Sequence, residues 1–193
     1  MSSIILTGDT SGTLTVSAPL VAGSNTLTLP AATGTISLLT QATSVASTSG
    51  TSIDFTGIPS WVKRITVMFS GVSTNGLSTP WLIQIGDSGG IETSGYLGSG
   101  IRNTGAINST TSFPLSVDNS AAVLLNGSIT IVLINSSTNL WAASGVFGTS
   151  NAAEVISVAG SKPLSATLDR VRITTTNGTD TFDAGTINIM YEG

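Results

Sequence analysis

The stretch "AAVLLNGSITIVLIN" (residues 121–135) carries the pattern that decides the fold. Apolar side chains, many of them β-branched, lie on both sides of Asn126-Gly127, and β-branched residues favour the pleated surface of a strand. Asn-Gly between two apolar runs is typical of a two-residue hairpin turn. We therefore expect a β-hairpin here. Its second arm, "ITIVLI" (129–134), is apolar on both faces and predicts a central strand that is covered on both sides.

The same kind of pattern continues through the C-terminal part of the chain, with short turns and no helical period. Pro114 places the strand "SFPLSV" (112–117) at an edge or a bulge, because proline cannot donate to a neighbouring strand. This arrangement predicts a jelly-roll-like β-sandwich over residues 53–193, and thus an all-β protein. The other expected strands are 61–69, 81–86, 140–148, 154–160, 168–176 and 186–192.

Residues 1–40 form a separate block in which apolar residues alternate with small polar ones. Three short strands bury too little apolar area to fold alone, so their apolar faces need copies of themselves or a partner. We expect an N-terminal arm of short strands that anchors the protein in an assembly. Residues 41–52, "QATSVASTSGTS", are small and polar and predict a linker. The residues expected to be buried in the assembly are Leu14, Val16, Leu27, Leu29, Ile36 and Leu38.

Composition excludes several classes of function. The chain has 193 residues, of which 8% are charged, with six Lys and Arg together and a net charge of −4. A nucleic-acid backbone or an anionic membrane surface requires a basic patch, so we expect neither partner. No apolar run is long enough for a transmembrane helix. The sequence contains no Cys and no His, which excludes disulfides and Cys/His metal sites.

The sequence offers few catalytic groups, and we expect no enzyme, cofactor or metal site. "GDSGG" (86–90) is similar to the sequence around a serine-protease nucleophile, but a serine nucleophile needs a base and there is no His. We interpret it as a glycine-rich turn. Asp180 and Asp183 are candidates for paired carboxylates or Ca²⁺ ligands. The favoured interpretation is that both belong to turns, where Asn, Asp and Gly are common.

Aromatic residues are the best candidates for a binding surface. Tyr96 lies in the glycine-rich segment 89–105, which we expect to be the longest irregular loop of the domain and a place for ligand binding. Together with Trp81 and Trp141 it could stack on a sugar or on a partner surface, and Arg102 is a candidate contact in the same loop. The favoured alternative is that Trp61, Trp81 and Trp141 lie in the core or at a subunit interface, because large aromatics are mostly buried.

Arg170 and Arg172 lie two residues apart in an expected strand and therefore share a face. We expect them to pair with Asp169, Asp180 or Asp183, or to bridge to another subunit.

Three stretches resemble parts of tailed-bacteriophage fibre and virion structural proteins. "GDTSGTLTVSAPLVAGSNTLTLPAATGT" (8–35) resembles a segment common at the N-terminal side of such proteins, ending in Thr-Leu-Pro-Ala-x-x-Gly-Thr as residues 28–35 do here. "IDFTGIPSWVKRITVMFSGVSTNG" (53–76) resembles the start of a small globular module of the same proteins. "RVRITTTNGTDTFDAGTINIMYEG" (170–193) resembles the end of that module.

The resemblance implies a homotrimer in the virion, assembled in the host cytoplasm. Its N-terminal arm would attach to other virion proteins of the capsid or tail, and its C-terminal domain would point outward. The chain lacks the extended repeated shaft of long tail fibres, which favours a short fibre, a head fibre or a capsid decoration protein. The alternative that the resemblance leaves open is a receptor-binding tail fibre that recognises a host surface glycan.

Overall fold

The computed structural model describes two compact units, Met1–Ile36 and Ser37–Gly193. The residues it describes are 3–7, 11–17, 31, 34, 36–77, 79–115, 122–150 and 153–193. Their regular structure consists of strands alone, which confirms the all-β prediction. Within these ranges there is no helix long and apolar enough to cross a membrane.

The first unit contains a β-hairpin of β1 (Ser3–Thr7) and β2 (Thr13–Ser17). The strands are antiparallel, with Ile4 opposite Val16 and Leu6 opposite Leu14. The predicted strand around Leu14 and Val16 is therefore confirmed, and its partner is the N-terminal segment. The second predicted strand, around Leu27 and Leu29, lies outside the described residues.

The end of the predicted arm and the predicted linker belong instead to the second unit. β3 (Leu39–Gln41) and β4 (Val45–Ala46) both pair with the last strand, β16 (Phe182–Glu192). Ser47 is completely buried and its hydroxyl donates to the carbonyl oxygen of Ala184 at 2.7 Å. The linker prediction for 41–52 is wrong because the open edge of β16 offers backbone partners, and small polar residues pair with them as well as apolar ones do.

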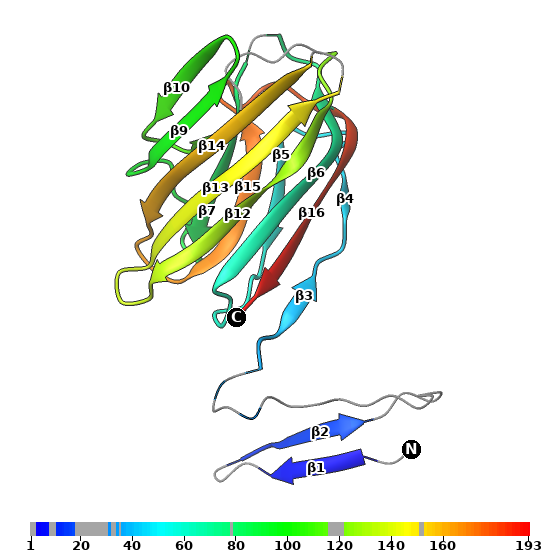
Figure 1. Cartoon of the computed structure of the whole chain (residues 1–193), viewed down its shortest axis with the longest axis vertical. Helices are drawn as coiled ribbons and strands as arrows, with labels where there is room; N and C mark the ends of the chain where they lie inside the picture. Colours follow the sequence, from blue (N-terminus) through cyan, green and yellow to red (C-terminus); the bar gives the residue numbers. More distant parts are fainter. Residues whose placement is uncertain are drawn as a thin grey trace. The chain divides into compact units, whose positions relative to one another are not determined.

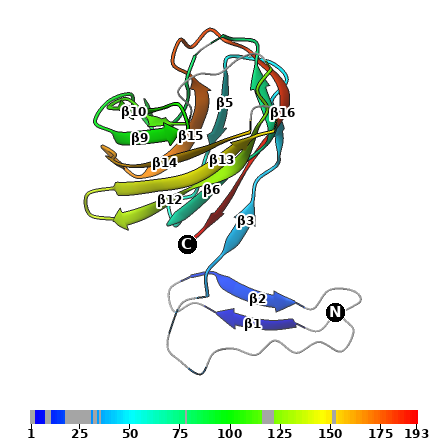
Figure 2. The ribbon, with the colours of Figure 1, turned by 45° about the horizontal axis from the view of Figure 1, so that its top comes forward.

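The second unit is built on a large antiparallel sheet, whose strands β14, β13, β12 and β6 run side by side in Figures 1 and 2. Consecutive strands β12, β13 and β14 are neighbours, which makes this part a meander. The order across the sheet is β10 (Gly105–Ser109), β9 (Leu97–Arg102), β14 (Glu154–Pro163), β13 (Leu140–Thr149), β12 (Leu125–Asn135), β6 (Arg64–Thr74), β16 and β3, with β4 also on β16.

A small sheet forms the second layer, with β5 and β15 visible behind the large sheet in Figure 1. Its edge strand contains Pro114, as the sequence predicts, because the edge requires no donor at that position. The order is β11 (Phe113–Pro114), β7 (Trp81–Asp87), β15 (Leu168–Thr175) and β5 (Ser52–Thr56), with β8 (Gly90–Ile91) also paired to β7.

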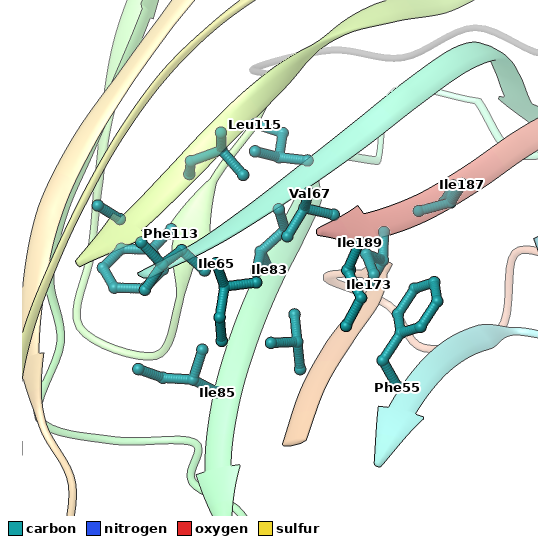
Figure 3. Packing of buried hydrophobic residues seen from close by; sticks show 14 of the residues in the cluster. Phe55, Ile65, Val67, Ile83, Ile85, Phe113, Leu115, Ile173, Ile187 and Ile189 are labelled. Atoms are coloured by element: carbon teal, nitrogen blue, oxygen red, sulfur yellow. The ribbon is translucent and has the colours of Figure 1, made fainter. Parts of the chain in front are cut away.

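The core lies between the two sheets. Figure 3 shows Val67 and Ile189 of the large sheet pointing toward Ile83 and Ile173 of the small sheet. These four side chains are at most 1% exposed. The two-layer packing is that of a β-sandwich, as predicted, whereas the meander in the large sheet does not by itself establish the jelly-roll connectivity.

Residues 125–135 form one continuous strand, so the hairpin prediction at Asn126-Gly127 is wrong. β12 pairs with β13 on one side and β6 on the other, and its register with β6 shifts between Leu125 and Gly127. Asn126 Oδ1 accepts a hydrogen bond from the Gly71 amide at 2.8 Å at this bulge. Gly127 has φ of 138°, and a Cβ there would lie 2.4 Å from the Val146 carbonyl oxygen. The Asn-Gly pair therefore lies at a β-bulge in β12 and allows β12 and β13 to approach closely.

β12 is central, as predicted, but only one of its faces is covered. Ile129 and Ile131 are completely buried in the core, whereas Val132 and Ile134 are exposed on the opposite face. No described strand of the second unit packs over that outer face.

Candidate functional site

A row of three polar residues crosses the outer face of the small sheet. In the strand register, Arg172 on β15 lies between Asp54 on β5 and Gln84 on β7. Arg172 Nε donates to Asp54 Oδ1 at 2.6 Å and Nη2 donates to Oδ2 at 3.0 Å. These hydrogen bonds raise the pKa of Arg172. The row is thus a neutral but strongly polar surface.

Two residues of this row, Gln84 and Arg172, line an open groove of about 540 Å³. Its volume falls within the range of roughly 300–1,000 Å³ that is typical of small-molecule sites. Leu82, Gln84 and Thr175 are buried and form its floor. Most of the remaining lining residues carry hydroxyl groups, among them Thr51, Thr93, Thr111, Thr174 and Thr176.

Hydrogen bonds hold the walls of the groove in place. Gln84 Nε2 donates to the Thr111 carbonyl oxygen at 3.1 Å. Asn177 at the rim accepts from Thr175 Oγ1 at 2.9 Å and donates to Asp180 Oδ1 at 2.8 Å. Within the described ranges no group donates to Gln84 Oε1, so this oxygen can accept from an occupant of the groove.

The groove is suited to hydrogen bonding with a neutral polar ligand. It offers hydroxyls, an amide and one guanidinium whose charge is balanced by Asp54. The part of the chain that the structure describes has no group of three or more His, Cys, Asp or Glu side chains that could hold a metal ion. Sequence reasoning missed the groove, since only the strand register brings Asp54, Gln84 and Arg172 together.

Tyr96 is in the core, so its assignment to a binding surface is wrong. Its side chain is 1% exposed and its ring packs edge-on against Phe113 at 5.1 Å between centroids. Its hydroxyl accepts from the Ile85 amide at 2.8 Å and donates to the Glu92 carbonyl oxygen at 3.0 Å. Burial raises the pKa of this hydroxyl. The segment 89–105 is also not irregular, since β8 and all of β9 lie within it.

Trp81 and Trp141 are buried as well, which confirms the core alternative and excludes them from a binding surface. Trp81 Nε1 donates to Thr74 Oγ1 at 3.2 Å. Trp61 is half-buried and packs against Tyr191 at 5.8 Å. A large ring adds more buried area than any other side chain, so it is drawn into the core unless a site holds it outside.

The three candidate arginines, Arg102, Arg170 and Arg172, are all engaged in ion pairs. Arg102 Nη1 donates to Glu154 Oε2 at 3.1 Å, and its side chain is only 11% exposed. Arg170 pairs with Asp169 at 2.6 Å, as one alternative predicted. Arg172 pairs with Asp54, which the sequence analysis did not consider.

The two carboxylates considered as a pair have separate partners. Asp180 belongs to a turn in which Asn177 Oδ1 accepts from the Thr179 and Asp180 amides at 3.0 and 3.1 Å. Asp183 lies within β16, where Ser73 Oγ donates to it. The turn interpretation is therefore confirmed for Asp180 and wrong for Asp183.

The turn interpretation of "GDSGG" is confirmed, since it connects β7 and β8. Asp87 Oδ2 accepts from Ser165 Oγ at 2.6 Å and Oδ1 accepts from the Gly89 amide at 2.7 Å. These hydrogen bonds lower the pKa of Asp87.

The residues expected to anchor the protein are exposed where their side chains are described. Val16, Ile36 and Leu38 are 50%, 71% and 59% exposed in the single chain. Leu14 lies on β2, opposite Leu6, and Leu27 and Leu29 are outside the described residues. The hairpin also exposes Ile4, Ile5 and Leu6, which the sequence analysis missed although "IILT" (4–7) has a strand-like composition.

No family model matches the chain, and the comparisons with curated proteins and with solved structures give no match either.

Proposed function

We propose that the chain is a structural protein of a bacteriophage virion, a homotrimeric short fibre or a capsid decoration or head-fibre protein. The resemblance of residues 8–35, 53–76 and 170–193 to such proteins supports the proposal. In this function the N-terminal unit attaches to other virion proteins, and the sandwich is displayed on the particle.

The observation that carries the proposal is the apolar hairpin of the first unit. Ile4 and Val16 face the same side of the β1–β2 pair, and Ile5 faces the other side. All three are at least half exposed in the single chain. A two-stranded hairpin is marginally stable in water, so aliphatic side chains on both of its faces favour a partner that covers them. The sandwich has a hydrophobic core of its own.

The test is incorporation of variants into particles. Phage that encode Ile4→Asp together with Val16→Asp should yield particles that lack the protein, because two carboxylates cannot be buried unpaired in an apolar interface. Thr56→Asp, an exposed change on the small sheet, is the control and should be incorporated normally. Normal incorporation of the hairpin variant would contradict attachment through the N-terminal unit. Copy number per particle then separates a capsid decoration, present in lattice multiples, from a tail fibre.

A second candidate function, recognition of a host surface glycan, is favoured by the groove over Gln84 and Arg172. Hydroxyl and amide groups with one guanidinium suit the hydroxyl groups of a sugar. The full chain on a glycan array should then bind a defined sugar, and Gln84→Ala should weaken binding about tenfold through the loss of one or two hydrogen bonds. Thr130→Ala, on the other sheet, is the control. Absence of any bound glycan would contradict this second function.

A further inference from the structure

The outer face of the large sheet carries a set of exposed aliphatic side chains. They lie on four neighbouring strands, β9, β14, β13 and β12, which run side by side in Figure 1. Each is between 40% and 74% exposed. We call this surface the outer face; its aliphatic residues are Leu97, Ile101, Val155, Val146, Val132 and Ile134.

The alternation of side chains explains why these residues point away from the core. On β12, Ile129 and Ile131 are completely buried, so their neighbours Val132 and Ile134 face outward. The same holds on β13, where Phe147 is buried and Val146 is 57% exposed. Strands that are apolar on both faces are typical of sheets covered on both sides. The described residues of the second unit supply only one of the two covers.

The outer face is also free of charge in its middle. Between the aliphatic residues the strands present small outward side chains such as Ser144, Ser157 and Ala159. The charged residues of these strands and of β6 and β16 lie at strand ends or are buried: Arg64 with Glu192, Arg102 with Glu154, Asp183 with Ser73, and Lys162 with Glu92.

We propose that the outer face is the surface through which copies of this chain contact one another, an inference that rests on the proposed homotrimer and names its interface. Copies with a net charge of −4 repel each other wherever charged surfaces meet. A face that meets an identical chain avoids this repulsion if it is uncharged. A different partner protein could have opposite charges and would not require a neutral face.

The size of the outer face fits such a contact. Together with the flanking strands β6 and β16, the outer face spans six strands at a spacing of about 4.8 Å, and about eight residues of roughly 3.3 Å along each give a flat area of roughly 650 Å². Side-chain relief increases the accessible area beyond this value. A stable interface buries about 800 Å² on each partner. The outer face with these two flanking strands therefore approaches the area that one partner buries in a stable interface.

The first experiment measures the mass of the full chain by sedimentation or native mass spectrometry. Wild type should be oligomeric, and Val146→Lys should reduce the mass to that of one chain, 19.4 kDa. Thr56→Lys, an equivalent change on the exposed face of the small sheet, should leave the oligomer intact. Circular dichroism checks that both variants stay folded.

The second experiment uses the absence of cysteine in the sequence, which makes any introduced thiol unique. Val146→Cys should react with a maleimide about tenfold more slowly than Thr56→Cys, because an interface core excludes solvent. This variant preserves the small apolar character of the site and so tests the inference even if the lysine variant unfolds.

The outcomes separate the inference from the proposed function. A monomeric wild type would overturn both the interface and the homotrimer. If Val146→Lys remains oligomeric and the thiol of Val146→Cys reacts with maleimide as fast as that of Thr56→Cys, the interface alone is overturned. Dissociation of the oligomer by Ile4→Asp would then assign the contact between chains to the hairpin.

Discussion

Lys162 on β14 and Glu92, between β8 and β9, form an ion pair in which the lysine side chain is only 4% exposed. Lys162 Nζ also donates to the Pro163 carbonyl oxygen at 2.7 Å and lies 5.5 Å from the centroid of the Tyr96 ring. Glu92 Oε1 accepts from the Ser165 amide at 2.7 Å. This network links the segment between β8 and β9, which contains Glu92, to β14 of the large sheet.

Removal of Lys162 should destabilise the sandwich strongly. Lys162→Met leaves the carboxylate of Glu92 without its cation, and the loss of one partner of a buried pair costs about 3 kcal/mol in the free energy of unfolding. Arg64→Met breaks the more exposed pair with Glu192 and should cost about 0.5 kcal/mol. Denaturant unfolding of the two variants measures the difference. Equal losses would contradict a structural role for burial of the lysine.

The ion pair between Lys162 and Glu92 should make the stability of the folded state depend on pH. Burial raises the pKa of Glu92, but hydrogen bonds from Lys162 and Ser165 outweigh it, so the pKa lies below its ordinary value of 4.5. The folded state therefore binds this proton more weakly than the unfolded state. The stabilisation is present at neutral pH and is lost as pH falls below about 4.5 through the lowered pKa.

A comparison of Glu92→Gln with wild type measures this dependence. Thermal midpoints between pH 7 and pH 3 should fall less steeply in the variant, because it lacks the titrating group. Glu192→Gln serves as the control for a loss of one surface carboxylate. Parallel curves for wild type and Glu92→Gln would show that Glu92 is not linked to folding.

Gly127→Ala should destabilise the large sheet by roughly 1–3 kcal/mol, since it adds strain at positive φ and places a methyl group against the Val146 carbonyl oxygen. Gly105→Ala is the matched control, because β10 leaves open space around a Cβ at that position and its φ is ordinary. That change should be neutral or slightly stabilising. Unfolding free energies of the two variants test the requirement for glycine at the bulge.

The two buried indoles should respond differently to replacement by phenylalanine. Trp81→Phe removes the hydrogen bond to Thr74, whereas Trp141 Nε1 is buried without a partner among the described residues. Both changes remove similar volume, so Trp81→Phe should cost about 1 kcal/mol more. Thermal unfolding of both variants measures this difference. A larger cost for Trp141→Phe would indicate a partner for its indole.

Period-two alternation was sufficient to predict most strands of the sandwich. It located β6, β7 and β13 to β16 because alternation is a property of each segment alone. The same reasoning failed at Asn126-Gly127, where a local turn preference is overridden by pairing of β12 with β6 and β13. It failed again at residues 41–52, whose strands exist because β16 offers them an edge.

The candidate site could not be predicted in the same way. Asp54, Gln84 and Arg172 are far apart in the sequence and have no motif in common. Tyr96 suggested a binding loop because of its glycine-rich surroundings, and yet its ring fills the core beside Phe113. Burial of a ring depends on the space that other strands leave, which no local pattern encodes.

By itself the sequence determined that this protein is all-β, that Pro114 stands at an edge or a bulge, and that charge is scarce, since each follows from residue chemistry or local period. Only the tertiary structure decided which face of β12 is covered, which strands meet Arg172, and where Lys162 finds its carboxylate. These features depend on strand register and on the collective burial of two sheets. The exposed Val132, Ile134 and Val146 follow from the same cause: apolar strands formed as the sequence predicts, and the described residues of the second unit cover only one side of them.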